Sequence, residues 1–173
     1  MKLVKAGKDS KYLSGIEDIY LDSFPRFERI KFDDLVSETP DCNLYAIIGD
    51  EKLVGLSYIR YHRNENLIYI IYLAVDRNER NKLYGSRALK EIDKLYPTKC
   101  KALCVEKPND SDIFTTKRVS FYTRNGYKLK GFEFELLGHR YCSMSKGNFN
   151  PESFKNILIK CFPDCKNFTD IGE

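Results

Sequence analysis

The chain has 173 residues, which is enough for one domain with a substantial core and short for two. Its content of 42% hydrophobic and 13% aromatic residues argues against disorder, and no apolar run approaches the roughly 18 residues of a membrane span. The net charge of +4 is modest in a chain that is 31% charged, and nucleic-acid binding would favour a longer basic stripe with interleaved aromatic residues. Because the N-terminus also lacks the apolar stretch of a signal peptide, we expect a cytoplasmic protein that binds neither nucleic acid nor membrane.

The cysteines do not form a metal-binding pattern. There is no C-x-x-C pair, and the two C-x-x-x-C spacings have no nearby pair of histidines, so neither zinc nor another metal is expected. In a cytoplasmic protein, reduced and mostly buried thiols are expected instead. The six residues are Cys42, Cys100, Cys104, Cys142, Cys161 and Cys165.

Strands and helices are predicted to alternate along the first half of the chain. In chain order we expect a strand over 2–6, helices over 10–23 and 32–38, and strands over 44–48, 53–61 and 67–75. Leu13, Ile16 and Ile19 recur on one face of the first helix, and the sequence from Gly49 to Lys52 predicts a hairpin turn. The strand over 67–75 is apolar nearly throughout, which is typical of a strand buried on both faces.

The second half continues the same alternation. We expect a helix over 84–96, a strand over 102–106, a helix over 115–125, strands near 127–136 and 139–145, and a final helix and tail over 150–173. Asn125 and Gly126 predict the end of one helix, and Asn150 with Pro151 predicts the start of the last. Apolar residues of the 84–96 helix fall on one side and are expected to be buried: Ala88, Leu89, Ile92, Leu95 and Tyr96. The whole chain, 1–173, is expected to form a single domain.

A basic, glycine-containing turn follows the apolar strand that ends at Val75 and opens the next helix. A helix N-terminus has unpaired backbone N–H groups and the positive end of the helix dipole. Four cations surround it in the sequence: Arg77, Arg80, Lys82 and Arg87. The segment therefore predicts a phosphate site, most naturally for a pyrophosphate. It has neither the spacing of a P-loop nor that of a dinucleotide-binding G-x-G-x-x-G turn.

Three motifs resemble those of the GNAT acyltransferase superfamily. Arg80-x-x-Leu83-x-Gly85 resembles its R/Q-x-x-G-x-G/A acetyl-CoA loop. The segment Ser120-Phe-Tyr-Thr-Arg-Asn-Gly-Tyr127 is similar to its F-Y-x-x-x-G-F element, and Phe24-Pro-Arg-Phe-Glu-Arg29 is similar to the F-P-x-x-E-R segment of many bacterial members. The motifs occur in the expected order, and the resemblance spans roughly residues 1 to 160, nearly the whole chain.

This resemblance implies both a fold and an activity. The fold is the GNAT fold, of the α/β (mixed α+β) class, with a central mixed, mostly antiparallel sheet of about six to seven strands and helices on both faces. The activity is that of a bacterial N-acetyltransferase, which moves an acetyl group from the cosubstrate acetyl-CoA directly to a primary amine of a small molecule or peptide. The sequence leaves open an inactive CoA-binding regulatory module, a basic nucleic-acid-associated protein, and a homodimer.

The resemblance also implies where acetyl-CoA would bind. In the superfamily the strand ending near Val75 separates from the strand ending near Glu106, and pantetheine pairs with the exposed backbone, carried over here to Leu73, Ala74 and Val75. The loop contacts, made chiefly through main chain with charge from Arg80, are Arg80, Asn81, Lys82, Leu83, Tyr84, Gly85 and Ser86. Leu83 stands where the family usually has glycine. We expect it to be helical, with its N–H available and its side chain turned away from the ligand.

Catalysis is expected without a covalent acyl-enzyme, because the chain has no G-x-S-x-G elbow and no cysteine–histidine dyad in its sequence pattern. A backbone N–H that holds the thioester carbonyl would also stabilise the developing oxyanion. Tyr122 is the candidate acid that protonates the departing thiolate, although Phe121 and Tyr122 could also simply pack the helix. Glu28 and Glu106 are candidates for the base, and each could instead be only a surface ion pair.

Overall fold

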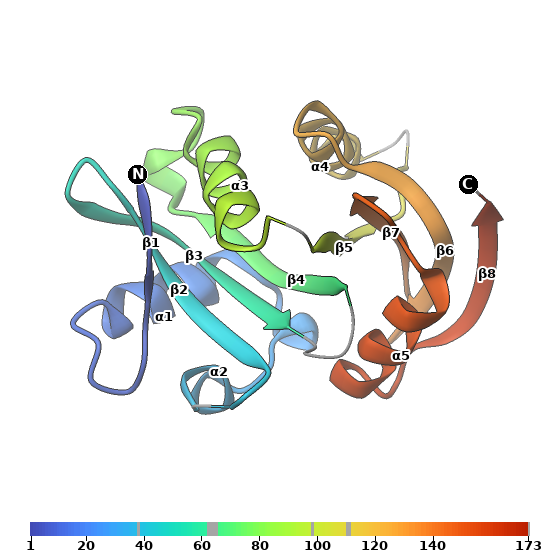
Figure 1. Ribbon diagram of the computed structural model, residues 1–173, viewed down its shortest axis with the longest axis horizontal. Coiled ribbons are helices and arrows are strands. Elements are labelled where there is room, and N and C mark those ends of the chain that lie inside the picture. Colours follow the sequence, from blue (N-terminus) through green and yellow to red (C-terminus); the bar gives the residue numbers. More distant parts are fainter. Residues whose placement is uncertain (38, 62–65, 98, 110–111, 173) are drawn as a thin grey trace. The chain divides into compact units, whose positions relative to one another are not determined.

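The computed structural model describes residues 1–37, 39–61, 66–97, 99–109 and 112–172 (Figure 1). Contacts divide the chain into two compact units. Unit 1 comprises Met1–Arg63 and Ile70–Thr98, and unit 2 comprises Asn64–Tyr69 and Lys99–Glu173. The strands are hydrogen-bonded to their neighbours in the order β1-β2-β3-β4-β5-β7-β6-β8. Among the strand pairings of the described residues, β4 and β5 run parallel and the others run antiparallel, so the mixed, mostly antiparallel sheet is confirmed.

Unit 1 holds three helices and most of four strands. Its elements are β1 (Lys2–Lys5), α1 (Leu13–Ser23), the 3-10 turn η1 (Arg26–Glu28), α2 (Phe32–Val36), β2 (Cys42–Gly49), β3 (Lys52–Tyr61), β4 (Leu67–Val75, which begins in unit 2), the 3-10 turn η2 (Arg77–Glu79) and α3 (Tyr84–Leu95). The hairpin turn between β2 and β3 is confirmed, with Asp50 and Glu51 at φ values of 50° and 64°. Of the helix predicted over 32–38, α2 ends at Val36, and residue 38 lies outside the described residues.

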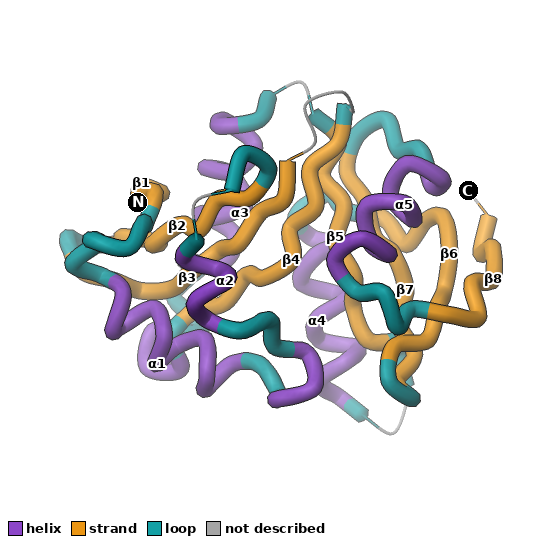
Figure 2. The backbone as a smooth tube through the Cα atoms, turned by 90° about the horizontal axis from the view of Figure 1, so that it is seen from below, coloured by secondary structure: helices purple, strands orange, loops and turns teal. Residues whose placement is uncertain are grey.

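The helices of unit 1 cover both faces of its strands (Figure 2). Ile16, Ile19 and Tyr20 of α1 and Leu35 of α2 share one buried cluster with Ala46 of β2. On the other face, Tyr84 and Ala88 of α3 pack against Ile47 and Val54. This arrangement follows from the alternation of side chains along a strand, which places Ala46 and Ile47 on opposite faces.

Two expectations for this unit need correction. Leu95 is 49% exposed, although Ala88, Leu89 and Ile92 of the same helix are buried. In β4 the residues from Leu67 to Ile70 are buried, whereas the strand alternates between half-buried and buried positions from Ile71 to Val75. Burial on both faces therefore holds for the first half of β4 alone.

A close backbone contact joins β3 to β4. A Cβ atom added at Gly55 would collide with the carbonyl oxygen of Ala74. The N–H of Asp76 donates to the carbonyl of Val54 at 2.9 Å, so the two strands meet on either side of this glycine. Only a residue without a side chain lets the end of β4 approach β3 this closely.

Unit 2 contains the remaining elements. These are β5 (Cys100–Glu106), α4 (Ile113–Arg124), β6 (Lys128–Leu136), β7 (His139–Lys146), α5 (Pro151–Cys161) and β8 (Lys166–Gly172). Phe154 of α5 anchors the helix against Tyr69 of β4 and Phe132 of β6, with ring centroids 5.0 and 5.7 Å away. The helix predicted over 115–125 begins earlier, at Ile113, because the side chain of Asp112 accepts a hydrogen bond from the N–H of Phe114 at 2.9 Å.

The strand β8 raises the count to eight, above the expected number. It pairs antiparallel with β6, and its burial pattern is exposed at every position except Phe168. Phe168 contacts the rings of Phe132 and Phe134 at 5.3 and 5.6 Å. Because the strand is held mainly by backbone pairing, its sequence lacks the alternation of apolar residues on which the prediction relied.

The six cysteines are free thiols, and Cys100, Cys142 and Cys165 are buried. Burial raises the pKa of Cys100 to about 11 and that of Cys165 to about 12, so these thiols stay protonated at neutral pH. Within the described ranges, no group of three or more histidine, cysteine or acidic residues could hold a metal ion. None of the helices in those ranges is long and apolar enough to cross a membrane.

Candidate active site

The predicted phosphate-binding loop, residues 80–86, comprises the segment between η2 and α3 and the first three residues of α3 in unit 1. Asn81 and Leu83 adopt left-handed backbone conformations, with φ values of 65° and 63°. The N–H of Arg87 donates to the carbonyl of Leu83 at 3.0 Å. The N–H groups of Tyr84, Gly85 and Ser86 come before this first helical bond and lack intrahelical acceptors. The local structure is therefore the helix N-terminus that the sequence predicted.

Leu83 is not helical, which corrects the expectation for this residue. It is the N-cap of α3, with φ 63° and ψ 8°, and its side chain leaves it 73% exposed. Asparagine tolerates this conformation, whereas for a leucine the left-handed region costs about 1–2 kcal/mol. The backbone conformation thus gives a physical reason for the glycine that the acetyl-CoA loop pattern has at the position of Leu83.

Replacing Leu83 with glycine is expected to tighten acetyl-CoA binding about fivefold, because the loop keeps its conformation and the ligand can approach the backbone more closely. The unfolding free energy should change by less than about 1 kcal/mol, since relief of strain is offset by the greater freedom of an unfolded glycine. Calorimetric titration measures the first effect and thermal unfolding the second. Leu83→Ala, which keeps the strained Cβ, is the matched control, and weaker binding by Leu83→Gly would contradict this account.

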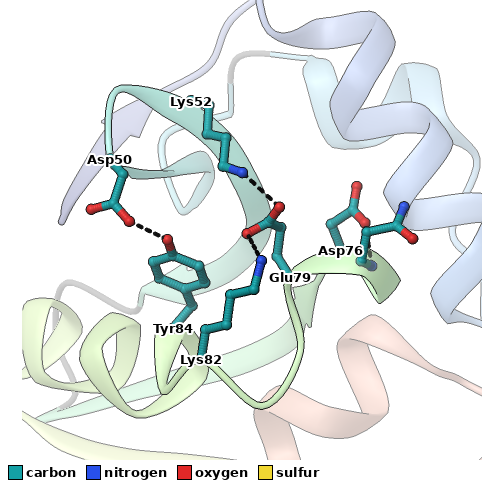
Figure 3. A network of polar contacts seen from close by, with 7 residues as sticks. Asp50, Lys52, Asp76, Glu79, Lys82 and Tyr84 are labelled. Carbon is teal, nitrogen blue, oxygen red and sulfur yellow. Dashed lines mark hydrogen bonds and ion pairs between the residues drawn. The ribbon is translucent and has the colours of Figure 1, made fainter.

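Two of the four cations predicted around the loop form ion pairs with acidic residues. Arg77 pairs with Asp22 at 3.2 Å. Lys82 pairs with Glu79 at 3.0 Å, and Lys52 from β3 pairs with the same carboxylate at 2.6 Å (Figure 3). Hydrogen bonds from Lys52 and then Lys82 hold the pKa of Glu79 below its ordinary value.

The two remaining cations lie directly at the loop. The Nε of Arg80 donates to the carbonyl of Val75 at 3.3 Å, and the residue is exposed. The guanidinium of Arg87 lies over the ring of Tyr84, 5.7 Å from its centroid. Of the four cations predicted from the sequence, Arg80 and Arg87 are thus the two for which no acidic partner is found among the described residues.

The described ladder between β4 and β5 involves only the first residues of β4. The ladder with β5 joins Leu67, Ile68 and Tyr69 to residues 100–102, and no pairing with β5 is found beyond Tyr69 in the described part of the strand. The carbonyls of Tyr72 and Ala74 point toward β3, where Ser57 donates to Tyr72 at 3.0 Å. Since successive residues of a strand alternate, the backbone groups of Leu73 and Val75 face the other edge.

The segment after α1 is fixed by side chains on either side of Glu28. The guanidinium of Arg29 donates to the carbonyls of Phe24 and Leu21 at 2.6 and 2.9 Å, which satisfies the C-terminal end of α1. The hydroxyl of Tyr72 donates to the carbonyl of Glu28 at 2.6 Å. The hydroxyl oxygen of Tyr72 in turn accepts a hydrogen bond from the N–H of Ile30 at 3.0 Å. The backbone of Glu28 is therefore held beside Tyr72 of β4, the residue that precedes Leu73.

Tyr122 and Glu106 both lie in unit 2, where burial raises the pKa of Tyr122 and the charge of Arg118, which pairs with Glu106, partly lowers it. The guanidinium of Arg118 pairs with the carboxylate of Glu106 at 2.8 Å, one helical turn before Tyr122 on α4. The ring of Tyr122 is half-buried against Phe121 and Tyr127, with centroids 5.0 and 5.6 Å away. For the hydroxyl of Tyr122, no hydrogen-bond partner is found among the described residues. Glu106 thus forms the ion pair that was the alternative to a catalytic role.

The environment of Tyr122 predicts its pH dependence. Burial raises the pKa of Tyr122 to about 12, and the nearby Arg118 opposes this only partly. A phenol acid works only when protonated, so its contribution should persist up to about pH 10 and fall as the pH rises through its pKa. We expect the rate of acetyl transfer to show no alkaline decline between about pH 7 and 10. A decline centred near pH 9 that is absent in Tyr122→Phe would contradict this.

A groove of about 390 Å³ opens beside Glu106 in unit 2. Its walls come from the end of β5, the segment with Pro108 and Asn109, and the turn between β6 and β7 at Gly138 and His139. The groove is thus formed by the end of one strand and two neighbouring loop segments of unit 2.

Three residues of this region carried no signal in the sequence. Lys52 and Asp50 belong to a hairpin some 30 positions from the loop that they contact, and Tyr72 is one of several tyrosines at strand positions. Only the spatial arrangement of β2, β3 and β4 identifies them.

Comparisons with known proteins agree with this fold. The profile described as "Acetyltransferase (GNAT) family" matches residues 13–127. A search of curated protein sequences finds no match. A solved structure from Bacteroides thetaiotaomicron assigned to the GNAT family superposes with a TM-score of 0.77 at 20% identity, over 92% of this chain and 95% of that one.

Two further structures share the fold at lower identity. The aminoglycoside 6'-N-acetyltransferase from Enterococcus faecium has a TM-score of 0.62 and 15% identity, over 87% of this chain and 100% of the other. A GNAT family acetyltransferase from Elizabethkingia anophelis with acetyl-CoA bound has a TM-score of 0.60 and 12% identity, over 85% and 97% of the two chains. With the profile match covering most of its length, the chain belongs to the GNAT acetyltransferase family.

Proposed function

We propose that the protein is an N-acetyltransferase, a single domain over 1–173, that moves an acetyl group from acetyl-CoA directly to a primary amine of a small molecule or peptide. The observation that supports this proposal most strongly is the backbone geometry at the start of α3, in a chain that belongs to the GNAT acetyltransferase family. There, a loop with two left-handed residues presents the N–H groups of Tyr84, Gly85 and Ser86. This loop follows β4 and η2, and among the described residues no pairing of β4 with β5 is found beyond Tyr69.

In this proposal the pyrophosphate and the pantetheine of acetyl-CoA would both bind to unit 1. The pyrophosphate would accept hydrogen bonds from the N–H groups at the start of α3, with charge from Arg80 and Lys82. Pantetheine would lie along the edge of β4 at Leu73, Ala74 and Val75. The N–H of Leu73, which faces that edge, would donate to the thioester carbonyl.

The chemistry needs no covalent intermediate with the protein. The amine nitrogen attacks the thioester carbon, and negative charge that develops on the carbonyl oxygen is stabilised by the backbone N–H. When the carbon–sulfur bond breaks, its electron pair stays on sulfur, which takes a proton from the hydroxyl of Tyr122. The proton lost by the amine goes to Glu28 or to water. Glu28 is preferred to Glu106, because the carboxylate of Glu106 is already paired with Arg118.

Thermal unfolding with and without acetyl-CoA, with CoA and ATP as controls, tests the binding step. A ligand at about a hundred times its dissociation constant adds roughly 2.7 kcal/mol of stability. We expect acetyl-CoA and CoA to raise the unfolding midpoint by several degrees and ATP not to raise it. The same preparation is then assayed for CoA release with a panel of primary amines.

The other two functions give different results in these assays. An inactive CoA-binding module would be stabilised by CoA and release none with any amine. A nucleic-acid-associated protein would ignore acetyl-CoA and bind nucleic acid with an affinity that falls steeply with salt. The cytoplasmic location and the homodimer stay predictions from the sequence.

A further inference from the structure

Lys52 is the first residue of β3, yet its ammonium group lies beside the phosphate-binding loop. Its Nζ is 2.6 Å from Oε1 of Glu79, and the Nζ of Lys82 is 3.0 Å from Oε2 of the same residue (Figure 3). The side chain of Glu79 is only 13% exposed, whereas those of Lys52 and Lys82 are 54% and 53% exposed. One mostly enclosed carboxylate therefore holds two lysines that both reach solvent.

A second contact fixes the same hairpin turn to the loop. The hydroxyl of Tyr84, the first residue of α3, donates to the carboxylate of Asp50 (Figure 3). Gly49 lies against the ring, so that a Cβ there would be 2.6 Å from Cε1 of Tyr84. The turn between β2 and β3 thus contacts the residue before the loop and the residue where the helix begins.

The two lysines on Glu79 differ in what they can do next. Lys82 belongs to the loop, so its side chain can turn toward a bound phosphate. The backbone of Lys52 is held in β3, so its ammonium group can stay beside Glu79. A mostly enclosed carboxylate that loses its only cation is strongly disfavoured. With Lys52 in place, Glu79 keeps one partner after Lys82 leaves, and the loop gains a free cation.

We propose that Lys52 is a positioning residue for the cosubstrate, which neutralises Glu79 and so releases Lys82 to the pyrophosphate of CoA. This inference rests on the proposed function and adds to it a residue outside the loop, together with a change of ion-pair partner on binding. Lys52 acts through Glu79 and Lys82 and need not contact the ligand.

The test is calorimetric titration of CoA into the full chain and its Lys52→Gln variant. Without Lys52, the carboxylate retains Lys82, and we expect CoA to bind about tenfold more weakly, the value of one charge-assisted hydrogen bond. Binding of S-acetylpantetheine, which lacks the pyrophosphate, should stay within about twofold. Adding Glu79→Gln to Lys52→Gln should restore the affinity for CoA, because no carboxylate then holds Lys82.

Lys94→Gln is the matched control for the loss of one positive charge. Lys94 is also exposed and paired, with Glu91 at 2.7 Å, and it lies at the far end of α3. CoA affinity in Lys52→Gln equal to that of Lys94→Gln would overturn the inference. So would an equal loss for S-acetylpantetheine, or a failure of Glu79→Gln to restore binding in a variant that unfolds at the normal temperature. Absence of CoA binding by the unchanged protein would instead overturn the proposed function itself.

Discussion

Tyr122→Phe is expected to lower kcat for acetyl transfer by about 100-fold or more, the usual range for a lost general acid, while the affinity for acetyl-CoA stays within about twofold. The substitution keeps the ring against Phe121 and Tyr127 and removes only the hydroxyl, which has no protein partner among the described residues. Without that proton the departing thiolate must leave unprotonated. Steady-state kinetics with the best amine of the panel, together with titration of acetyl-CoA, separates turnover from binding.

Tyr127→Phe is the matched control for this experiment. Tyr127 is buried, and its ring contacts that of Tyr122 with centroids 5.6 Å apart, so the control removes a hydroxyl from the same aromatic cluster. We expect its kcat to stay within about twofold, because it has no role in proton transfer. If Tyr122→Phe had normal turnover, or if both variants lost it equally, Tyr122 would serve packing only.

Gly55→Ala is expected to lower the unfolding free energy by about 1–3 kcal/mol, because the new Cβ meets the backbone carbonyl of Ala74, which cannot turn away as a side chain can. For a chain of this size, this corresponds to a fall of roughly 2–12 °C in the unfolding midpoint. The displaced backbone is the end of β4, where pantetheine is proposed to bind. We therefore also expect weaker binding of acetyl-CoA, measured at a temperature where the variant is folded.

Gly15→Ala provides the matched control in the same unit. A Cβ at Gly15 would meet only the end of the Leu53 side chain at 2.6 Å, which can move, and alanine favours the helix in which Gly15 lies. We expect this variant to differ by less than about 1 kcal/mol in unfolding free energy and to bind acetyl-CoA normally. Equal stability of Gly55→Ala and Gly15→Ala would contradict the close approach of β3 and β4.

The strands and helices that could be predicted are those with a continuous physical signal. The strand over 67–75 and its bounds follow from one unbroken apolar run, and the start of α3 follows from the change to helical periodicity after a basic turn. Asn150 also caps α5 as expected, because its side chain accepts from the N–H of Ser153 at 3.0 Å. The signal for β8 was absent, since backbone pairing with β6 does not require apolar residues.

At the candidate site the sequence identified the loop and not its conformation or its partners. The family pattern has glycine where Leu83 stands, but only the φ value of 63° shows that the position is left-handed. Charge counting predicted four cations and could not reveal that Glu79 binds Lys82, or that Lys52 of β3 binds the same carboxylate. Pairing between side chains distant in sequence depends on the register of the sheet, which no local pattern encodes.

The most direct test of the central claim is a crystal structure of the protein with acetyl-CoA. The account predicts pyrophosphate oxygens at about 2.7–3.2 Å from the N–H nitrogens of Tyr84, Gly85 and Ser86, and the thioester carbonyl at a similar distance from the N–H nitrogen of Leu73. Acetyl-CoA bound away from the start of α3, or with its pantetheine remote from the outer edge of β4, would contradict it.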